Sequence, residues 1–242
     1  MVKAFIYGAI SVLPLILGAL IGNLKLNSKI IAAITAFGSG VLIYALTFGL
    51  VEESFFIGGI LPTVIGFGLG SACFIFGDYL INRSGGRRHK RYQVYSPAQQ
   101  SSGKAIAMGA ILDAIPESVA LGIAIAEGKE MGLLILFAII FNNLPEAISA
   151  APGLKKEGFS KNQIFLVWLT VAIAAIIVTI FSYRFLPELD KSILALIEAF
   201  AGGSILAMLA NSMIPEAYQD GGISVTPLTT LGFLISFIIS RS

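Results

Sequence analysis

The sequence has little of what soluble enzymes and redox proteins use. Its 242 residues include one cysteine, Cys73, and one histidine, His89, so an intrachain disulfide and a histidine-rich metal site are excluded. Only 12% of the residues are charged, about half the average for soluble domains. The net charge of +2 gives no reason to expect a nucleic-acid partner.

Hydrophobic residues make up 56% of the chain and stand in long uninterrupted blocks. A helix needs about 20 such residues to cross the hydrocarbon core of a bilayer. The pattern predicts an all-α membrane bundle, one domain over 1–242, with lipid as its surroundings. Eight blocks qualify: 4–22, 29–51, 55–80, 104–126, 131–152, 162–185, 193–217 and 224–240.

The basic residues predict the orientation of these eight spans. The odd-numbered connections hold eleven Lys and Arg residues, and the remaining segments hold five. Because cytoplasmic loops are enriched in Lys and Arg, both termini are expected outside the cell. The polar segment 81–103, which contains the run Arg87-Arg88-His89-Lys90-Arg91, is then a cytoplasmic loop.

Two of the blocks resemble each other. Residues 36–54 and 199–217 align without gaps at an offset of 163. They belong to the second and seventh spans, which run in opposite directions, so the similarity predicts an inverted repeat of spans 1–3 and 6–8 around spans 4 and 5. Chance similarity between two Gly- and Ala-rich helices is the alternative. The identical pairs are Ala36/Ala199, Phe37/Phe200, Gly40/Gly203, Leu46/Leu209 and Glu53/Glu216.

The fourth span carries two carboxylates inside an apolar block. Asp113 and Glu117 are four residues apart, so they share one face of a helix. A charged residue at that depth costs at least about 2.5–3.5 kcal/mol on insertion scales, which makes it a candidate functional residue. Pro116 frees the carbonyl of Leu112, because proline has no N–H to donate.

The fifth span repeats this arrangement. Asn142 and Glu146 are again four residues apart, and Asn143 stands three residues before Glu146. Pro145 frees the carbonyl of Phe141. If the two faces meet, they form an oxygen-rich cluster whose carboxylates a divalent cation would neutralise. A structural role for proline-kinked helices joined by polar side chains is the alternative.

These residues resemble the fourth- and fifth-span motifs of the ZIP (Zrt/Irt-like) metal transporters, which follow the pattern His-Asn-x-Pro-Glu-Gly. The equivalents here are Asp113-Ala114-Ile115-Pro116-Glu117-Ser118 and Asn142-Asn143-Leu144-Pro145-Glu146-Ala147. The resemblance implies eight spans, outside termini, and a metal site often holding two ions. The implied ligands are Asp113, Glu117, Asn142, Asn143 and Glu146.

Three positions depart from that pattern. Asp113 and Asn142 stand where the family has histidine, and Ala114 stands where it has asparagine. Oxygen ligands suit harder ions such as Mn²⁺, Fe²⁺, Mg²⁺ or Ca²⁺ better than Zn²⁺. The missing asparagine indicates one bound ion in place of two.

The expected function is therefore transport of a divalent metal ion, as substrate, toward the cytoplasm across the plasma or bacterial inner membrane. A non-transporting structural or regulatory membrane protein with a relict site is the alternative. No Ser/His/Asp or HExxH set indicates an enzyme, and no tightly bound cofactor is expected. A homodimer is left open. The terminal acids Glu52, Glu53, Asp78, Glu216 and Asp220 are interpreted as solvated span ends, or as lining access funnels in the case of the glutamates.

Overall fold

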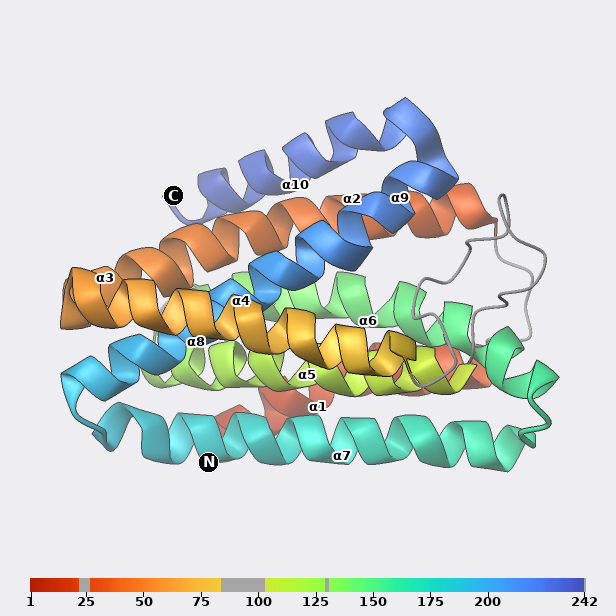
Figure 1. Cartoon of the computed structure of the whole chain (residues 1–242), viewed down its shortest axis with the longest axis horizontal. Coiled ribbons are helices and arrows are strands. Elements are labelled where there is room, and N and C mark those ends of the chain that lie inside the picture. The colour runs from red at the N-terminus through yellow and green to blue at the C-terminus, as the bar shows by residue number, and fades with distance from the viewer. Residues whose placement is uncertain (22–26, 84–102, 129–130, 242) are drawn as a thin grey trace.

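The computed structural model describes residues 1–21, 27–83, 103–128 and 131–241. Every regular element within those ranges is a helix (Figure 1). The α-helices are α1 (Val2–Ile21), α2 (Ser28–Tyr44), α3 (Glu52–Gly58), α4 (Ile60–Arg83), α5 (Gly103–Ala126), α6 (Met131–Lys156), α7 (Lys161–Phe185), α8 (Lys191–Met208), α9 (Ile214–Gly221) and α10 (Thr226–Ile239). Most of the predicted cytoplasmic loop lies outside the described residues.

Two π-helical segments interrupt the long helices. The segment η1 (Ala45–Val51) joins α2 to α3, and η3 (Leu209–Met213) joins α8 to α9. Two short 3₁₀ segments are the remaining elements among the described residues: η2 (Leu186–Glu188) follows α7, and η4 (Gly222–Val225) precedes α10. The second span therefore extends to Gly58, seven residues beyond its predicted end at residue 51. The third span begins at Ile60, five residues after its predicted start at residue 55. The reversal takes place at Gly59, whose φ of 79° is strained for any residue with a side chain.

Seven helical stretches among the described residues are long and apolar enough to cross a membrane. The count is seven because Lys191–Ile239 forms one continuous helical stretch of 49 residues. The chain turns back within it, between α9 and α10 (Figure 1). By itself α10 has 14 residues, about 21 Å at 1.5 Å per residue, which is short of the roughly 30 Å hydrocarbon core.

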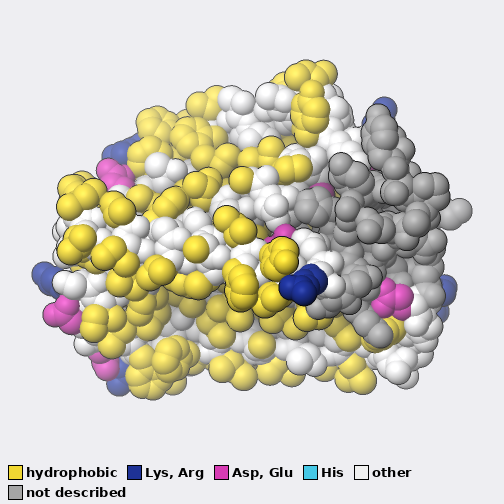
Figure 2. Space-filling view, in the orientation of Figure 1, with side chains coloured by type: hydrophobic (Ala, Val, Ile, Leu, Met, Phe, Trp, Pro, Cys, Tyr) yellow, Lys and Arg dark blue, Asp and Glu magenta, His cyan; other side chains and the backbone are white. Residues whose placement is uncertain are grey.

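The outer surface fits a lipid environment. Hydrophobic side chains are spread widely over the described part of the face in Figure 2, and charged side chains are few there. In the most apolar part of α5 and of α6, 67% of the residues are buried, compared with 22% in α4. Consequently α5 and α6, which carry the predicted site, are the central helices, and α4 is peripheral.

The helices pack as two groups. One group contains α1, α5, α6 and α7, which pack mainly against one another. The other contains the tight pairs α2–α10 and α4–α8. Contacts of α2 with α6 and of α5 with α8 join the groups.

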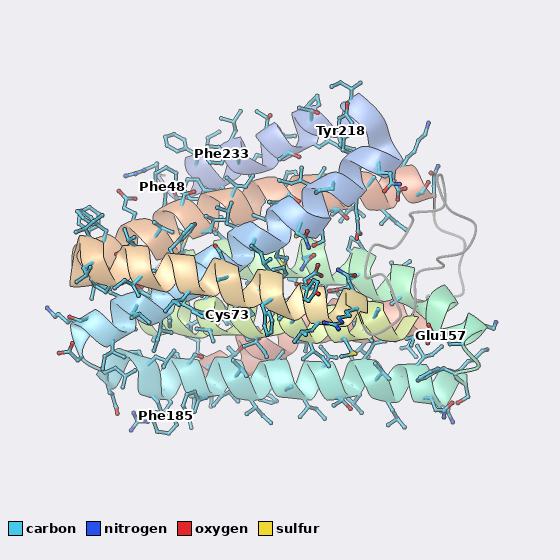
Figure 3. The ribbon with its side chains drawn as sticks, viewed as in Figure 1. Phe48, Cys73, Glu157, Phe185, Tyr218 and Phe233 are labelled. Carbon is cyan, nitrogen blue, oxygen red and sulfur yellow. The ribbon has the colours of Figure 1, made fainter. Side chains whose placement is uncertain are left out.

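Glycine brings both tight pairs into backbone contact. A Cβ on Gly203 would lie 2.1 Å from the Phe67 carbonyl oxygen, and one on Gly40 would lie 1.9 Å from the Thr229 carbonyl oxygen. Only glycine fits at such positions. Aromatic rings extend the α2–α10 contact, since Phe233 lies 6.5 Å, centroid to centroid, from Phe48 (Figure 3).

Candidate metal site on α5 and α6

The predicted site on α5 is buried. Asp113 is 4% exposed and Glu117 is 1% exposed. Their spacing of four residues places both on one side of the helix, and Pro116 between them is buried within α5. The helix continues through Pro116 because the surrounding helices hold it in place, as is common for membrane helices.

A hydrogen bond joins α5 to α6 at this point. The Nδ2 of Asn142 donates to the Oε1 of Glu117 at 2.9 Å, and both side chains are buried. This bond links residues 25 positions apart in the chain. The prediction that the two polar faces meet is therefore confirmed for Glu117 and Asn142.

The neighbouring asparagine points to a different helix. Asn143 donates from Nδ2 to the carbonyl oxygen of Ser11 in α1 at 2.9 Å. The Ser11 hydroxyl donates in turn to the carbonyl of Gly8 at 2.8 Å. Asn142 and Asn143 thus tie α6 to two helices, and only Asn142 shares a contact with Glu117. The contact with Ser11 does not test the sequence-based prediction that Asn143 binds the metal, and it gives Asn143 a role in positioning α6.

Glu146 lies one turn further along α6 and is 5% exposed. The next residue, Ala147, packs directly against α1, because a Cβ on Gly18 would lie 2.5 Å from its Cβ. Pro145, like Pro116, is buried inside its helix. The second carboxylate-bearing segment is thus fixed between α1 and α5.

The carboxylates do not converge on one point. Among the described residues, no three Asp, Glu, His or Cys side chains stand close enough to hold one metal ion. The expectation that Asp113, Glu117 and Glu146 surround one cation is therefore not met in this conformation. An ion bound between α5 and α6 would be held by at most two of these carboxylates. Its other ligands would be amide or backbone oxygens, such as the side-chain oxygen of Asn142.

The sequence gives these buried acids no basic neighbours on their own helices. The lysines of α5 and α6 stand near the helix ends, at Lys104, Lys155 and Lys156. A buried carboxyl group either keeps its proton or, when it is ionised, requires a cation or hydrogen-bond donors beside it. Asn142 supplies one such donor, to Glu117.

The interpretation of Asp78 as a solvated span end is wrong. Asp78 is 5% exposed, and its Oδ2 accepts hydrogen bonds from Asn82 and from Asn211, each at 2.8 Å. It joins α4 to η3. The position of Asp78 near the end of a predicted span suggested exposure to solvent. The segment η3 packs beside this end of α4 and buries the side chain.

Glu52 at the start of α3 is exposed, and Glu53, Glu216 and Asp220 are half-buried, in keeping with span ends. A further acid, Glu198 in α8, is 0% exposed and was not predicted from the sequence. The same rule that selects Glu117 would have found it, because Glu198 stands inside the apolar block 193–217.

Comparison with known protein families gives no match, and comparison with curated proteins gives none either.

Proposed function

We propose that this protein is a divalent metal ion transporter of the ZIP type, with its ion site on α5 and α6. The buried contact between Glu117 and Asn142 supports the proposal most directly. It brings together a carboxylate and an amide from two matched Pro-Glu segments at the centre of the bundle. Ionisable groups at that depth mark ion pathways in membrane proteins.

The donor chemistry supports a hard cation as the substrate. Asp113, Glu117, Asn142 and Glu146 offer oxygen alone, since an amide coordinates through its carbonyl. Ca²⁺, Mg²⁺ and Mn²⁺ prefer carboxylate, carbonyl and water oxygens. Asn143, the fifth residue of the predicted set, has its amide nitrogen bonded to α1 and so positions α6.

The packing supports alternating access by relative movement of the two helix groups. The site lies within the group α1, α5, α6 and α7, while α2–α10 and α4–α8 form the other. Many transporters expose a fixed site to each side in turn by moving one bundle against another. Moving the first group against the second would open the buried site toward one side of the membrane and then toward the other.

Several observations support the inverted repeat that this mechanism uses. The π-helices at Ala45–Val51 and Leu209–Met213 fall at matching places under the offset of 163. So do Gly59 and Gly222, both with positive φ. Figure 1 shows α2–α3 running in the opposite direction to α8–α9.

The glycine contacts support the repeat independently. Gly70 faces the carbonyl of Phe200, and Gly232 faces that of Phe37. Phe37 and Phe200 are 163 residues apart, and Gly70 and Gly232 are 162 apart. The pair α4–α8 is thus built like the pair α10–α2. If α10 crosses the membrane as α4 does, the chain has eight spans. With the distribution of Lys and Arg described above, both termini are then outside, and we propose a plasma or inner membrane as the location.

Ion flux into liposomes tests the proposal. The purified protein is reconstituted, and uptake of Mn²⁺, Fe²⁺ and Zn²⁺ is measured for the wild type and for Glu117→Gln. The matched control is Glu157→Gln, at an exposed position in the turn after α6 (Figure 3). We expect the wild type and the Glu157 variant to transport, and the Glu117 variant to be correctly folded and inactive. Absence of flux from the folded wild type for every ion would refute transport.

One observation favours a second candidate, a structural protein with a relict site. No three acidic side chains among the described residues form a metal-binding group, and the Glu117–Asn142 bond alone would serve to join two helices. This candidate predicts no flux, and it predicts that Glu117→Gln destabilises the fold. The transporter predicts the opposite result in both assays.

A further inference from the structure

The side-chain amide of Asn142 has two ends with opposite chemistry. Its Oδ1 can coordinate a cation, whereas its Nδ2 carries hydrogens that can only donate. In this structure Nδ2 is the atom that faces Glu117, and it donates to Oε1 of that residue at 2.9 Å. This arrangement excludes an ion held jointly by Asn142 and Glu117, because the amide hydrogens lie beside the carboxyl oxygen and would repel a cation.

A half-turn of the amide removes this conflict. Rotation about the bond between Cβ and the amide carbon exchanges Oδ1 with the NH₂ group, and the two groups are nearly equal in size. The exchange therefore needs no additional space, although Asn142 and Glu117 are only 6% and 1% exposed. The same side chain can act as a donor to Glu117 or as a metal ligand beside it, but it cannot do both at once.

The neighbouring residues confine this change to the side chain. Asn143 donates to the carbonyl oxygen of Ser11 at 2.9 Å, and this acceptor belongs to the backbone of α1. One turn further along α6, Ala147 packs against α1 so closely that a Cβ on Gly18 would lie 2.5 Å from its Cβ. These two contacts hold α6 against α1, so Asn142 can turn while the helix that carries it keeps its position.

We propose that Asn142 takes the place of the cation when the ion site is empty, and that this lets the empty transporter change its access from one side of the membrane to the other. With an ion bound, Oδ1 of Asn142 and the carboxyl group of Glu117 share it. After release the amide turns, and Nδ2 donates to Glu117. The buried ligand oxygen thus keeps a polar partner in both states, and burying it without one would be costly.

The inference rests on the proposed transport function and concerns the regulation of the same site. It does not depend on the number of protons on Glu117, because the oxygen of an ionised carboxylate and the carbonyl oxygen of a protonated acid both accept a hydrogen bond. A carrier whose empty site can cross the membrane gives net uptake, whereas a carrier that crosses only when loaded exchanges ions. The donor end of Asn142 therefore decides between net uptake and exchange, and its oxygen end contributes to ion binding.

Nuclear magnetic resonance of the side-chain amides tests the half-turn without a transport assay. The protein carries isotope-labelled asparagine, and the signals of Asn142 and Asn143 are identified by their loss in Asn142→Asp and Asn143→Asp. We expect Glu117→Gln to shift the Asn142 amide signal before any ion is added. In the wild type, the diamagnetic ions Mg²⁺ and Zn²⁺ should shift the Asn142 signal and leave that of Asn143 in place. An Asn142 signal that stays unchanged while the same ion raises the Tm overturns the proposal.

Mn²⁺ flux measured in two modes tests the consequence for transport. Liposomes with the wild type, Asn142→Asp or the matched control Asn143→Asp are assayed for net uptake and for exchange of labelled against internal Mn²⁺. Asn142→Asp keeps an oxygen ligand and removes the N–H donors at about pH 8, where an ordinary aspartate is ionised. We expect its net uptake to fall at least about tenfold relative to its exchange, the factor that corresponds to the loss of one buried hydrogen bond.

The control should change both modes by the same factor, because Asn143 bonds to α1 and not to Glu117. Net uptake retained in Asn142→Asp, or lost together with exchange, overturns the proposal. A selective loss of net uptake in Asn143→Asp overturns it as well. Absence of both modes in the folded wild type refutes transport instead, and the amide signal then still shows whether a bound ion turns Asn142.

Discussion

The backbone contact between α4 and α8 predicts a large difference between two alanine substitutions on one helix. Gly70 and Gly68 are two residues apart in α4, on different faces. A Cβ on Gly70 would lie 2.0 Å from the carbonyl oxygen of Phe200 and 2.8 Å from its carbonyl carbon, whereas nothing lies within 4 Å of a Cβ on Gly68. Gly70→Ala should therefore disrupt the α4–α8 pair, and Gly68→Ala should leave it intact.

The magnitude follows from that geometry. Ordinary contact begins at 3.4 Å, so the two helices would have to separate by about 1.4 Å at Gly70. The opposing atoms belong to the backbone of α8, so no side-chain rotation relieves the clash. The separation also weakens the bond from the Ser204 hydroxyl to the Gly70 carbonyl, at 3.1 Å. Overpacking of this kind costs about 3 kcal/mol, which corresponds to a fall in Tm of about 6–12 °C for a chain of this size.

Thermal unfolding in a mild detergent, followed by circular dichroism, measures the effect. Gly68→Ala should keep the wild-type Tm or raise it slightly, because alanine is the better helix former. The helical content of both variants before heating checks that each has inserted and folded. If Gly70→Ala unfolds at the same temperature as Gly68→Ala, the close approach of α4 and α8 is wrong.

The remaining predictions concern the ion site. Glu146→Gln should abolish metal uptake while keeping the wild-type Tm within about 3 °C, because removing a buried charge relieves a desolvation cost; wild-type uptake by a correctly inserted variant would refute a ligand role. Asp113→His should raise the uptake of Zn²⁺ relative to Mn²⁺ in competition assays, since imidazole suits Zn²⁺; an unchanged ratio would exclude ligand softness at this position. Asn143→Ala should lower stability by about 1 kcal/mol through loss of its bond to α1 with uptake largely retained, whereas Asn142→Ala should lose uptake; equal loss in both variants would place Asn143 in the ion site.

The residues of the candidate site could be selected from the sequence because burial of charge in a membrane is costly. That rule selected Asp113, Glu117 and Glu146, and all three are 5% exposed or less. Helical spacing correctly placed Glu117 and Asn142 on faces that meet. These predictions need only the local helix geometry and the cost of desolvation, and both can be derived from one segment at a time.

The partner of each side chain was not predictable in the same way. Asn142 and Asn143 are adjacent and chemically identical, and yet one bonds to α5 and the other to the backbone of α1. Adjacent helical positions point about 100° apart, so the choice depends on which helices flank α6. Asp78 was misjudged for the same reason, because its two amide partners come from Asn82 on its own helix and from Asn211 far along the chain.

The two π-helices could not be predicted from the sequence patterns either. A π-helical turn carries one residue more than an α-helical turn, so it rotates everything after it relative to the preceding face. In η1 this rotation precedes Glu53, and in η3 it precedes Glu216, the two acids that match in the aligned segments. Both π-helices also lie in the group formed by α2–α10 and α4–α8, and η1 packs against α8 where Val51 meets Gly202. Because π-helical turns occur frequently at functional sites, η1 and η3 mark the two places where the second helix group departs from regular α-helix geometry just before Glu53 and Glu216.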